Sequence, residues 1–490
     1  DLDFQDTRQA YANKFNQNAD FILLDSRIEA SDDVRETPQD FRVAIENSGS
    51  TYLREVEVDE TFELPFRFNR NSNVHNKIVQ QQDDGVIDEF WQVGAYEREG
   101  TGIKSVGGAF KLFDDAPETS LGLDVLEHPE LVLSQDLDDW VSIGDFGATA
   151  GITGNRNGNL AADDDTAGIQ AAIDAAAAAG ATTVYVPEGE WVLNGTVQVH
   201  GSVQHFIGLG GEILGNGTIE IVDGDADTVF IKGLRGRLTN QPSSQVEVLH
   251  NTDRTLAVED TSGWRYRAAL DETTGETLAG DLFLNNIVTG RLIVEEGQNV
   301  WARQLNIEGR FEVFDNPEFD VPFEAKIVNN GGKLWALGFK TEATGTHVLT
   351  RNDGKTEIFG NFQQSGPIVD QDGNRVPQFI TIDADFSFVA GRNGFDDNPN
   401  YGSVLEIRDG EAREGRINAD LYSAIRPETI ASDRVIVDNG DPGFSINEVE
   451  GVLVEEFVPR EGGFIGSSAL FVDSGSGVSL EYEADLDPGQ

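Results

Sequence analysis

The chain has 490 residues and carries 87 acidic against 35 basic residues, a formal net charge of −52. A charge this negative repels nucleic-acid backbones and anionic lipids, and no apolar run approaches the roughly 20 residues of a membrane span, so we expect no nucleic-acid partner and no membrane insertion. Cysteine and methionine are both absent, which excludes disulfides, thiol catalysis and thiolate metal sites.

Nine of the basic residues are lysines. An acid-rich, lysine-poor composition is typical of a surface solvated in high salt and predicts a marine or halophilic source. The absence of both readily oxidised side chains suits exposure outside the cell. Because the chain starts at Asp1 without a signal-peptide pattern, we expect a processed form that is secreted or held at the cell surface.

Residues 1–139 predict a mixed α/β domain. The stretch from Phe4 to Asp25 is compatible with a helix, whereas residues 56–68 alternate as one extended strand. That strand would place four apolar side chains on one face, those of Phe62, Leu64, Phe66 and Phe68. The acidic stretch from Leu133 to Trp140 predicts the boundary to the next domain.

Three consecutive aspartates, Asp163, Asp164 and Asp165, precede an alanine-rich run that ends at Gly180. The run predicts a helix over 165–179, and carboxylates at its start accept backbone N–H groups and favour the positive end of the helix dipole. We therefore interpret the triplet as a helix start rather than as a metal or catalytic site. The segment 182–191 that follows is the first expected strand of a repeat.

Residues 183–426 consist of short β-runs separated by Gly, Asn and Asp, with internal repeats. "NGTVQV" from Asn194 and "NGTIEI" from Asn216 are 22 residues apart, as are "GKLWALGF" from Gly332 and "GKTEIFGN" from Gly354. A constant period of this length predicts a β-solenoid whose coils bury their apolar faces by stacking.

Two tryptophans, Trp301 and Trp335, align with an offset of 34 residues, one coil plus a 12-residue insertion. They are candidate glycan-stacking platforms, and the alternative is stacking in the coil interior.

The segments 141–151 and 163–193 resemble the N-terminal signature of the pectate-lyase-3 type parallel β-helices, with Asp164, Asp165 and Thr166 at its Asp-Asp-Thr motif. The resemblance implies a mainly β fold, a right-handed single-stranded parallel β-helix over residues 140–430 with an N-terminal capping helix at 165–179. The family includes glycan lyases, glycan hydrolases and phage tailspike domains, so the resemblance does not settle the chemistry.

No complete catalytic pattern is found. Glycan hydrolysis generally needs two carboxylates roughly 5–10 Å apart, and single candidates among 87 acidic residues identify nothing. "NTD" at 251–253 resembles one polygalacturonase motif, but the companion motifs are missing. Calcium is the one cofactor candidate, at two partial loop matches that polar corners also explain: Asp223, Asp225 and Asp227, and Asp370 and Asp372.

The C-terminal residues 431–490 predict a small β-sandwich-like module, and residues 435–445 resemble the start of the golvesin/xanthan-lyase type carbohydrate-binding module. The expected Gly-x-Trp is absent, and the segment is short for that module. We therefore expect an incomplete module or one whose sheet is completed by strand donation from another copy.

The sequence favours an acidic extracellular or cell-surface β-helix protein that binds a polysaccharide or cell-surface glycan, or that self-assembles as a structural subunit or homo-oligomer, without a recognisable catalytic site. A polysaccharide lyase or glycoside hydrolase, and a phage tailspike-like adhesin, remain the alternatives. Any site is expected on the coil flank between Asp223 and Glu357.

Overall fold

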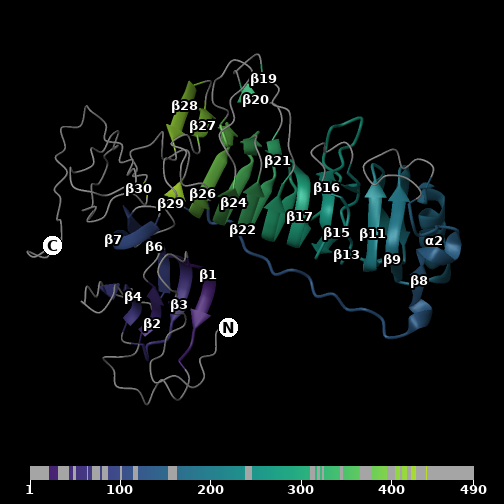
Figure 1. The fold of residues 1–490 in the computed structure, drawn as a ribbon, viewed down its shortest axis with the longest axis horizontal. Coiled ribbons are helices and arrows are strands. Elements are labelled where there is room, and N and C mark those ends of the chain that lie inside the picture. Colours follow the sequence, from purple (N-terminus) through teal and green to yellow (C-terminus); the bar gives the residue numbers. More distant parts are fainter. Residues whose placement is uncertain are drawn as a thin grey trace, which may run out of the picture.

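In the computed structural model, the described residues are mainly β, with a small N-terminal group of strands and a long stack of parallel strands (Figure 1). These residues are 21–30, 43–47, 51–62, 64–68, 78–79, 86–99, 102–113, 120–152, 163–237, 245–308, 315–316, 321–322, 325–342, 346–364, 377–393, 403–408, 411–416, 421–425 and 437–438.

The N-terminal strands form two sheets. The four-stranded sheet has the order β1-β3-β6-β7, with β1 parallel to β3 and the other pairs antiparallel. Its strands are β1 (Phe21–Ile28), β3 (Thr51–Val58), β6 (Val86–Glu99) and β7 (Gly102–Phe113). The second sheet contains β2 (Val43–Asn47), β4 (Leu64–Phe68) and β5 (Ile78–Val79).

Two expectations for this region are wrong in part. Residues 21–25, expected at the end of a helix, belong to β1, because Ile22 and Leu24 alternate along a strand and pack against the stack of parallel strands. The single strand expected over residues 56–68 is two strands, β3 and β4, separated by a turn in which Phe62 N–H donates to the Asp59 carbonyl at 3.0 Å.

The parallel strands form two series, in which most strands pair with the second strand along the chain. The first series is β8 (Trp140–Ser142), β9 (Thr183–Leu193), β11 (His205–Gly215), β13 (Thr228–Lys232), β15 (Thr255–Glu259), β17 (Leu282–Glu295), β18 (Asn299–Ile307), β22 (Lys333–Glu342), β24 (Lys355–Gln364) and β26 (Asp385–Asn393). The second is β10 (Thr196–Gly201), β12 (Thr218–Gly224), β14 (Glu247–His250), β16 (Ser262–Ala268), the C-terminal part of β17, β21 (Ala325–Asn330), β23 (Thr346–Arg351), β25 (Phe379–Ile382) and β27 (Ser403–Arg408).

Strand pairing matches the repeats seen in the sequence. Thr196 pairs with Thr218 and Lys333 with Lys355, each 22 residues apart, and Trp301 pairs with Trp335. The insertion between the two tryptophans contributes β19 (Asp315–Asn316) and β20 (Val321–Pro322). A long parallel stack with this periodicity is consistent with a β-helix. The first strand of the stack is β8, not the segment at 182–191.

Side chains alternate between the interior of the stack and its outer face, as the pleat requires. Along β18, Val300 and Ala302 belong to the main interior cluster, and Trp301 between them belongs to a separate cluster on the outer face. Dozens of fully buried aliphatic side chains line the interior, and each stabilises the fold by about 1.5–3 kcal/mol relative to exposure.

The helix α2 (Thr166–Ala179) lies at one end of the stack, beside β8 and β9 (Figure 1). Ile169 and Ile173 belong to the same interior cluster as the strands. Gly180 ends the helix with φ 73°, a left-handed conformation that glycine adopts without strain. The helix is preceded by two short 3-10 turns, η2 (Leu137–Asp139) and η3 (Ile143–Phe146).

The aspartates before α2 bind backbone groups of the first coil. Asp165 is the N-cap residue, but its carboxylate makes no cap hydrogen bond. It accepts instead from the N–H groups of Thr149 at 2.8 Å and Val192 at 2.9 Å. Asp164 accepts from Thr166 N–H at 3.1 Å and Asn194 N–H at 3.2 Å. Asp164 and Asp165 therefore stand at the start of the helix and also bind it to the neighbouring chain, which the simple cap expectation missed.

After β27 the described chain continues in antiparallel strands, β28 (Glu411–Arg416), β29 (Leu421–Ile425) and β30 (Val437–Asp438). Apart from β30, the predicted C-terminal module lies outside the described residues. The domain limits at 139 and 430 stay predictions. A search of the described helices finds none that is long and apolar enough to cross a membrane.

Candidate functional site

The outer face of the first strand series carries a row of large side chains in register. Phe283 pairs with Trp301, Trp301 with Trp335, and Trp335 with Glu357 on successive strands. The rings of Phe283 and Trp301 are stacked, with centroids 4.8 Å apart and planes 18° apart. We call Phe283, Trp301 and Trp335 the aromatic row. Its members face away from the stack interior, so their burial requires a cover.

The cover is the segment that leads from the N-terminal strands into the stack. We call residues 120–132 the strap. Leu123 belongs to the buried cluster of the aromatic row, and Leu121 and Val125 pack against it. The strap leaves Trp301 6% exposed and Trp335 2% exposed.

Polar contacts with the tryptophans differ. Trp301 Nε1 donates to the Asp124 carbonyl at 2.8 Å, and Arg303 on the next outward position donates to the Leu126 carbonyl at 3.1 Å. Trp335 Nε1 is buried and has no hydrogen-bond partner among the described residues. The guanidinium carbon of Arg303 lies 5.3 Å from the centre of the Trp335 ring. The strap thus satisfies one indole N–H of the row and leaves the other unsatisfied.

One end of the strap is fixed by a buried carboxylate. Glu357, fully buried on β24, accepts from Ser120 Oγ at 2.5 Å, Leu121 N–H at 2.7 Å and Leu123 N–H at 3.3 Å. Arg54 from β3 donates to Glu357 at 3.2 Å, so the N-terminal sheet shares this contact.

A second carboxylate completes this group, because Arg54 also donates to both oxygens of Asp25, at 2.8 and 3.1 Å. We call Asp25, Arg54 and Glu357 the latch. Burial raises the pKa of Glu357, while the Arg54 charge and the hydrogen bonds from the strap act in the opposite direction.

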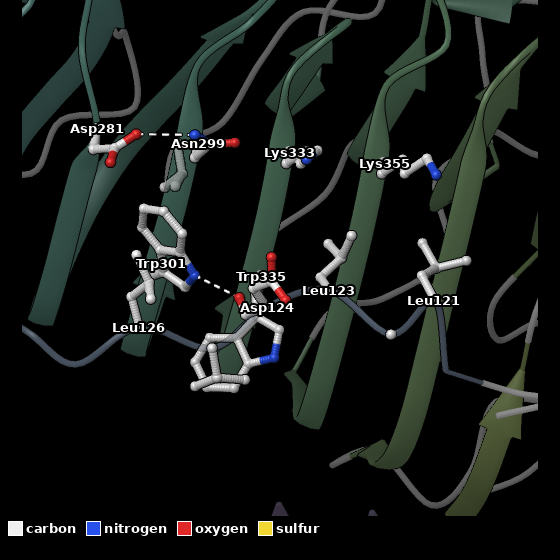
Figure 2. Close-up of a pocket in the computed structure, with 13 residues that line it drawn as sticks. Leu121, Leu123, Asp124, Leu126, Asp281, Asn299, Trp301, Lys333, Trp335 and Lys355 are labelled. Atoms are coloured by element: carbon white, nitrogen blue, oxygen red, sulfur yellow. Dashed lines mark hydrogen bonds between the residues drawn. The ribbon is translucent and has the colours of Figure 1, made fainter. Parts of the chain in front are cut away.

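An open groove of about 560 Å³ lies between the strap and the margin of the sheet. Figure 2 shows Asp281, Asn299, Lys333 and Lys355 in one row across neighbouring strands, with Trp301, Trp335 and the strap beside them. Asn299 Nδ2 donates to Asp281 Oδ1 at 2.9 Å, which orients both side chains.

Lys333 and Lys355 form the basic part of the groove. They are register partners on the neighbouring parallel strands β22 and β24, which places their Cα atoms roughly 4.8 Å apart. Both are exposed, and neither forms an ion pair with any residue that the structure describes. Two other described lysines do: Lys232 binds Glu259 at 2.9 Å and Lys340 binds Glu308 at 2.7 Å. Two neighbouring lysines without an ion pair to any described carboxylate are unusual in a chain with 87 acidic residues.

The first candidate calcium turn surrounds an arginine. Arg254 is buried and donates to the carbonyls of Ala226 at 2.5 Å and Val222 at 3.1 Å. Burial lowers its pKa, and the charges of the three aspartates counteract this shift, those of Asp223, Asp225 and Asp227. Thr252 Oγ1 donates to Asp223 at 2.8 Å.

No cluster of three or more His, Asp or Glu side chains suited to a metal is found in the described chain. The second candidate turn, with Asp370 and Asp372, lies outside the described residues, so calcium binding stays a prediction.

The structure places the predicted tryptophans together and adds residues that sequence reasoning missed. Trp301 and Trp335 are buried, as the interior alternative expected, but on the outer face rather than inside the coil. Asp281, Asn299 and the two lysines were not anticipated. The repeats beginning at Gly332 and Gly354 both start with Gly-Lys, and this signal was sufficient to place Lys333 beside Lys355.

Comparison with known proteins finds local sequence similarity to polysaccharide-modifying enzymes. The chain is 40% identical over 111 residues to mannuronan C5-epimerase AlgE2 of Azotobacter vinelandii, and 38% identical over 107 residues to AlgE5 of the same organism. Each match covers 21% of this chain and 10% of the relative. The chain therefore spans about a tenth of the length of these relatives. No protein-family model matches the chain, so the resemblance to the pectate-lyase-3 type is not confirmed.

Two solved structures are similar at low sequence identity. ORF18 of Geobacillus virus E2 is 11% identical, with a TM-score of 0.28 over 69% of this chain and 75% of that chain. PfbA, a surface adhesin of Streptococcus pneumoniae, is 10% identical, with a TM-score of 0.23 over 58% of this chain and 96% of that chain. At such TM-scores neither likeness supports a statement about this chain.

Proposed function

We propose that this chain is an extracellular, right-handed β-helix protein that binds an acidic polysaccharide in the groove beside the strap. The observation that carries the proposal is the pair Lys333 and Lys355, exposed, in register and without an anionic partner in the described chain, at the margin of a groove of about 560 Å³. A polyanion is the ligand class that supplies those partners. A net charge of −52 repels polyanions elsewhere on the molecule, so binding would be confined to this groove.

The groove offers both kinds of contact that sugar recognition uses. Asn299 and Asp281 provide hydrogen-bonding groups already oriented toward one another, and Leu126 of the strap, which lines the groove and is 45% exposed, provides apolar surface. A hydrogen bond to a charged group is worth about 1.5–3 kcal/mol, so loss of both lysine contacts would weaken binding at least tenfold. The local similarity to enzymes named for their action on mannuronan supports a polysaccharide as ligand.

The test is calorimetric titration of the full chain with mannuronan oligosaccharides and with a neutral mannan of similar length. We expect binding of the acidic glycan and at least a tenfold weaker affinity in the double variant Lys333→Gln/Lys355→Gln. Lys232→Gln is the matched control, because it removes a charge from the same series of strands outside the groove. Equal binding of both glycans, or unchanged affinity in the double variant, would refute the proposal. Repeating the titration with calcium and with a chelator tests the calcium prediction.

A second candidate function is catalysis on the same polysaccharide, favoured by the 40% identity over 111 residues to a mannuronan C5-epimerase. The groove contains two carboxylates, Asp124 and Asp281, beside the two lysines. The binding proposal predicts no new absorbance from unsaturated uronate, no new reducing ends and no change at C5 of the sugar after prolonged incubation. Any of these changes, if lost in Lys333→Gln/Lys355→Gln, would assign the groove to an enzyme.

A further inference from the structure

The aromatic row is arranged like a binding surface but is covered by the chain itself. Phe283, Trp301 and Trp335 occupy consecutive positions on three neighbouring strands and face outward. Aromatic rings in such a row offer apolar faces to planar or ring-shaped ligands. The part of the chain that covers them, the strap, is 169 or more residues away in sequence from any tryptophan of the row.

The strap is attached to the stack weakly compared with the strands beneath it. Residues 121–133 of the described chain form neither helix nor strand, so the strap has no backbone ladder with the sheet. Its polar contacts to β18 are those of Trp301 and Arg303 with two strap carbonyls, and an ion pair of Arg303 with the exposed carboxylate of Glu127 at 3.4 Å. A typical hydrogen bond contributes about 0.5–1.5 kcal/mol net. Two apolar side chains of the strap are exposed, Leu126 by 45% and Val132 by 69%.

The latch is the strongest attachment of the strap. Glu357 binds two strap N–H groups and the Ser120 hydroxyl, and through Arg54 it also binds the N-terminal sheet. The Arg54 guanidinium in turn lies 5.2 Å from the centre of the Phe359 ring on the same strand as Glu357. The position of the N-terminal sheet is thereby coupled to that of the strap.

We propose that the strap is a displaceable cover over a second glycan subsite, the aromatic row, and that the latch controls its opening. This inference rests on the proposed function, because it extends the polysaccharide groove onto Phe283, Trp301 and Trp335. The buried Trp335 N–H, which lacks an acceptor in the described chain, gains one when a sugar hydroxyl or carboxylate replaces the strap. Displacement exposes the outward surfaces of the three aromatic side chains, of which Phe283 and Trp301 are stacked, next to Lys333 and Lys355.

The inference predicts that the apparent glycan affinity equals the affinity of the open form multiplied by the fraction of molecules that are open. A variant that weakens the latch should therefore bind more tightly than the unmodified chain. Glu357→Ala removes the carboxylate that accepts the hydrogen bonds of the strap and of Arg54. If the alanine variant fails to fold, Glu357→Gln serves in its place, because glutamine keeps the side-chain volume. Glu259→Ala is the matched control, since Glu259 lies on the outer face of the same strand series and binds Lys232 rather than the strap.

Two measurements on the full chain test it: amide hydrogen exchange of the strap, and affinity for mannuronan oligosaccharides. We expect at least tenfold faster exchange of the Leu121 and Leu123 amides in the Glu357 variants, and an affinity increase of severalfold. In the unmodified chain, saturating glycan should also speed exchange of the strap.

Strap exchange that is unchanged in the Glu357 variants, or slowed by glycan, overturns the cover while leaving the groove proposal intact. Faster exchange without an affinity gain overturns the second subsite. Absence of glycan binding in every variant refutes the proposed function together with this inference.

Discussion

Replacing Asp165 by alanine tests whether the acidic triplet is structural. Its side chain is 7% exposed, and its two oxygens accept from Thr149 N–H at 2.8 Å and Val192 N–H at 2.9 Å. Hydrogen bonds to a charged group contribute about 1.5–3 kcal/mol each. Counting the partly exposed Thr149 bond at the low end, we expect Asp165→Ala to cost about 3–5 kcal/mol in the local stability of α2.

The assay is amide hydrogen exchange of α2 and β9, which reports local opening. A loss of about 3–5 kcal/mol corresponds to exchange roughly a hundred- to a thousand-fold faster, because about 1.4 kcal/mol is a factor of ten. Asp164→Ala is the matched control: its carboxylate is exposed, and we expect a loss below about 1 kcal/mol. Loss of glycan binding in Asp165→Ala with unchanged exchange would refute the structural assignment.

Three further outcomes are expected. The first concerns the ion pair between Arg54 and Glu357, whose side chains are both buried. In a double-mutant cycle of Arg54→Leu and Glu357→Gln, we expect an interaction free energy of about 2–5 kcal/mol between the two side chains, measured by amide exchange of the strap and of the N-terminal sheet. An interaction free energy near zero would contradict the latch. Burial lowers the pKa of His250 from 6.5 to about 4, so its neutral form stabilises the fold by about 3 kcal/mol above pH 6.5, and this contribution is lost as the pH falls toward 4. Urea unfolding at several pH values should show that loss, and His250→Gln should reduce the pH dependence. Trp301→Phe should lower the free energy of strap opening by about 1 kcal/mol more than Trp335→Phe does, because of the two indole N–H groups only that of Trp301 donates to a strap carbonyl. Equal effects of the two substitutions on amide exchange of the strap would argue against that hydrogen bond.

The repeat architecture was predictable because each coil repeats the local sequence pattern of its neighbours. The 22-residue offsets at Asn194 and at Gly332 became strand pairs in register, and the alanine-rich run became α2. These features depend on neighbouring coils of similar sequence, where apolar alternation and glycine turns repeat. Of the helix expected over residues 4–25, only residues 21–25 lie within the described chain, and there the prediction is wrong because Ile22 and Leu24, two residues apart on a strand, pack against a surface far away in the sequence.

The strap could not be located from sequence periodicity alone. Its contacts join residues about 180 to 240 positions apart, as between Asp124 and Trp301 or Leu121 and Glu357. Alternation of Leu121, Leu123 and Val125 indicates an extended segment but not its partner. Because the strap could not be located, Trp301 and Trp335 were expected either as exposed platforms or as interior residues. In the structure they lie on the outer face of the strands, beneath the strap.

The most direct test of the groove is lysine acetylation with and without bound glycan, followed by mass spectrometry. With nine lysines in 490 residues, each modified site is assigned unambiguously. We expect mannuronan oligosaccharides to protect Lys333 and Lys355 and to leave Lys232 as reactive as before. Equal reactivity of Lys333 and Lys355 with and without a bound acidic glycan would contradict the assignment of this groove as its binding site.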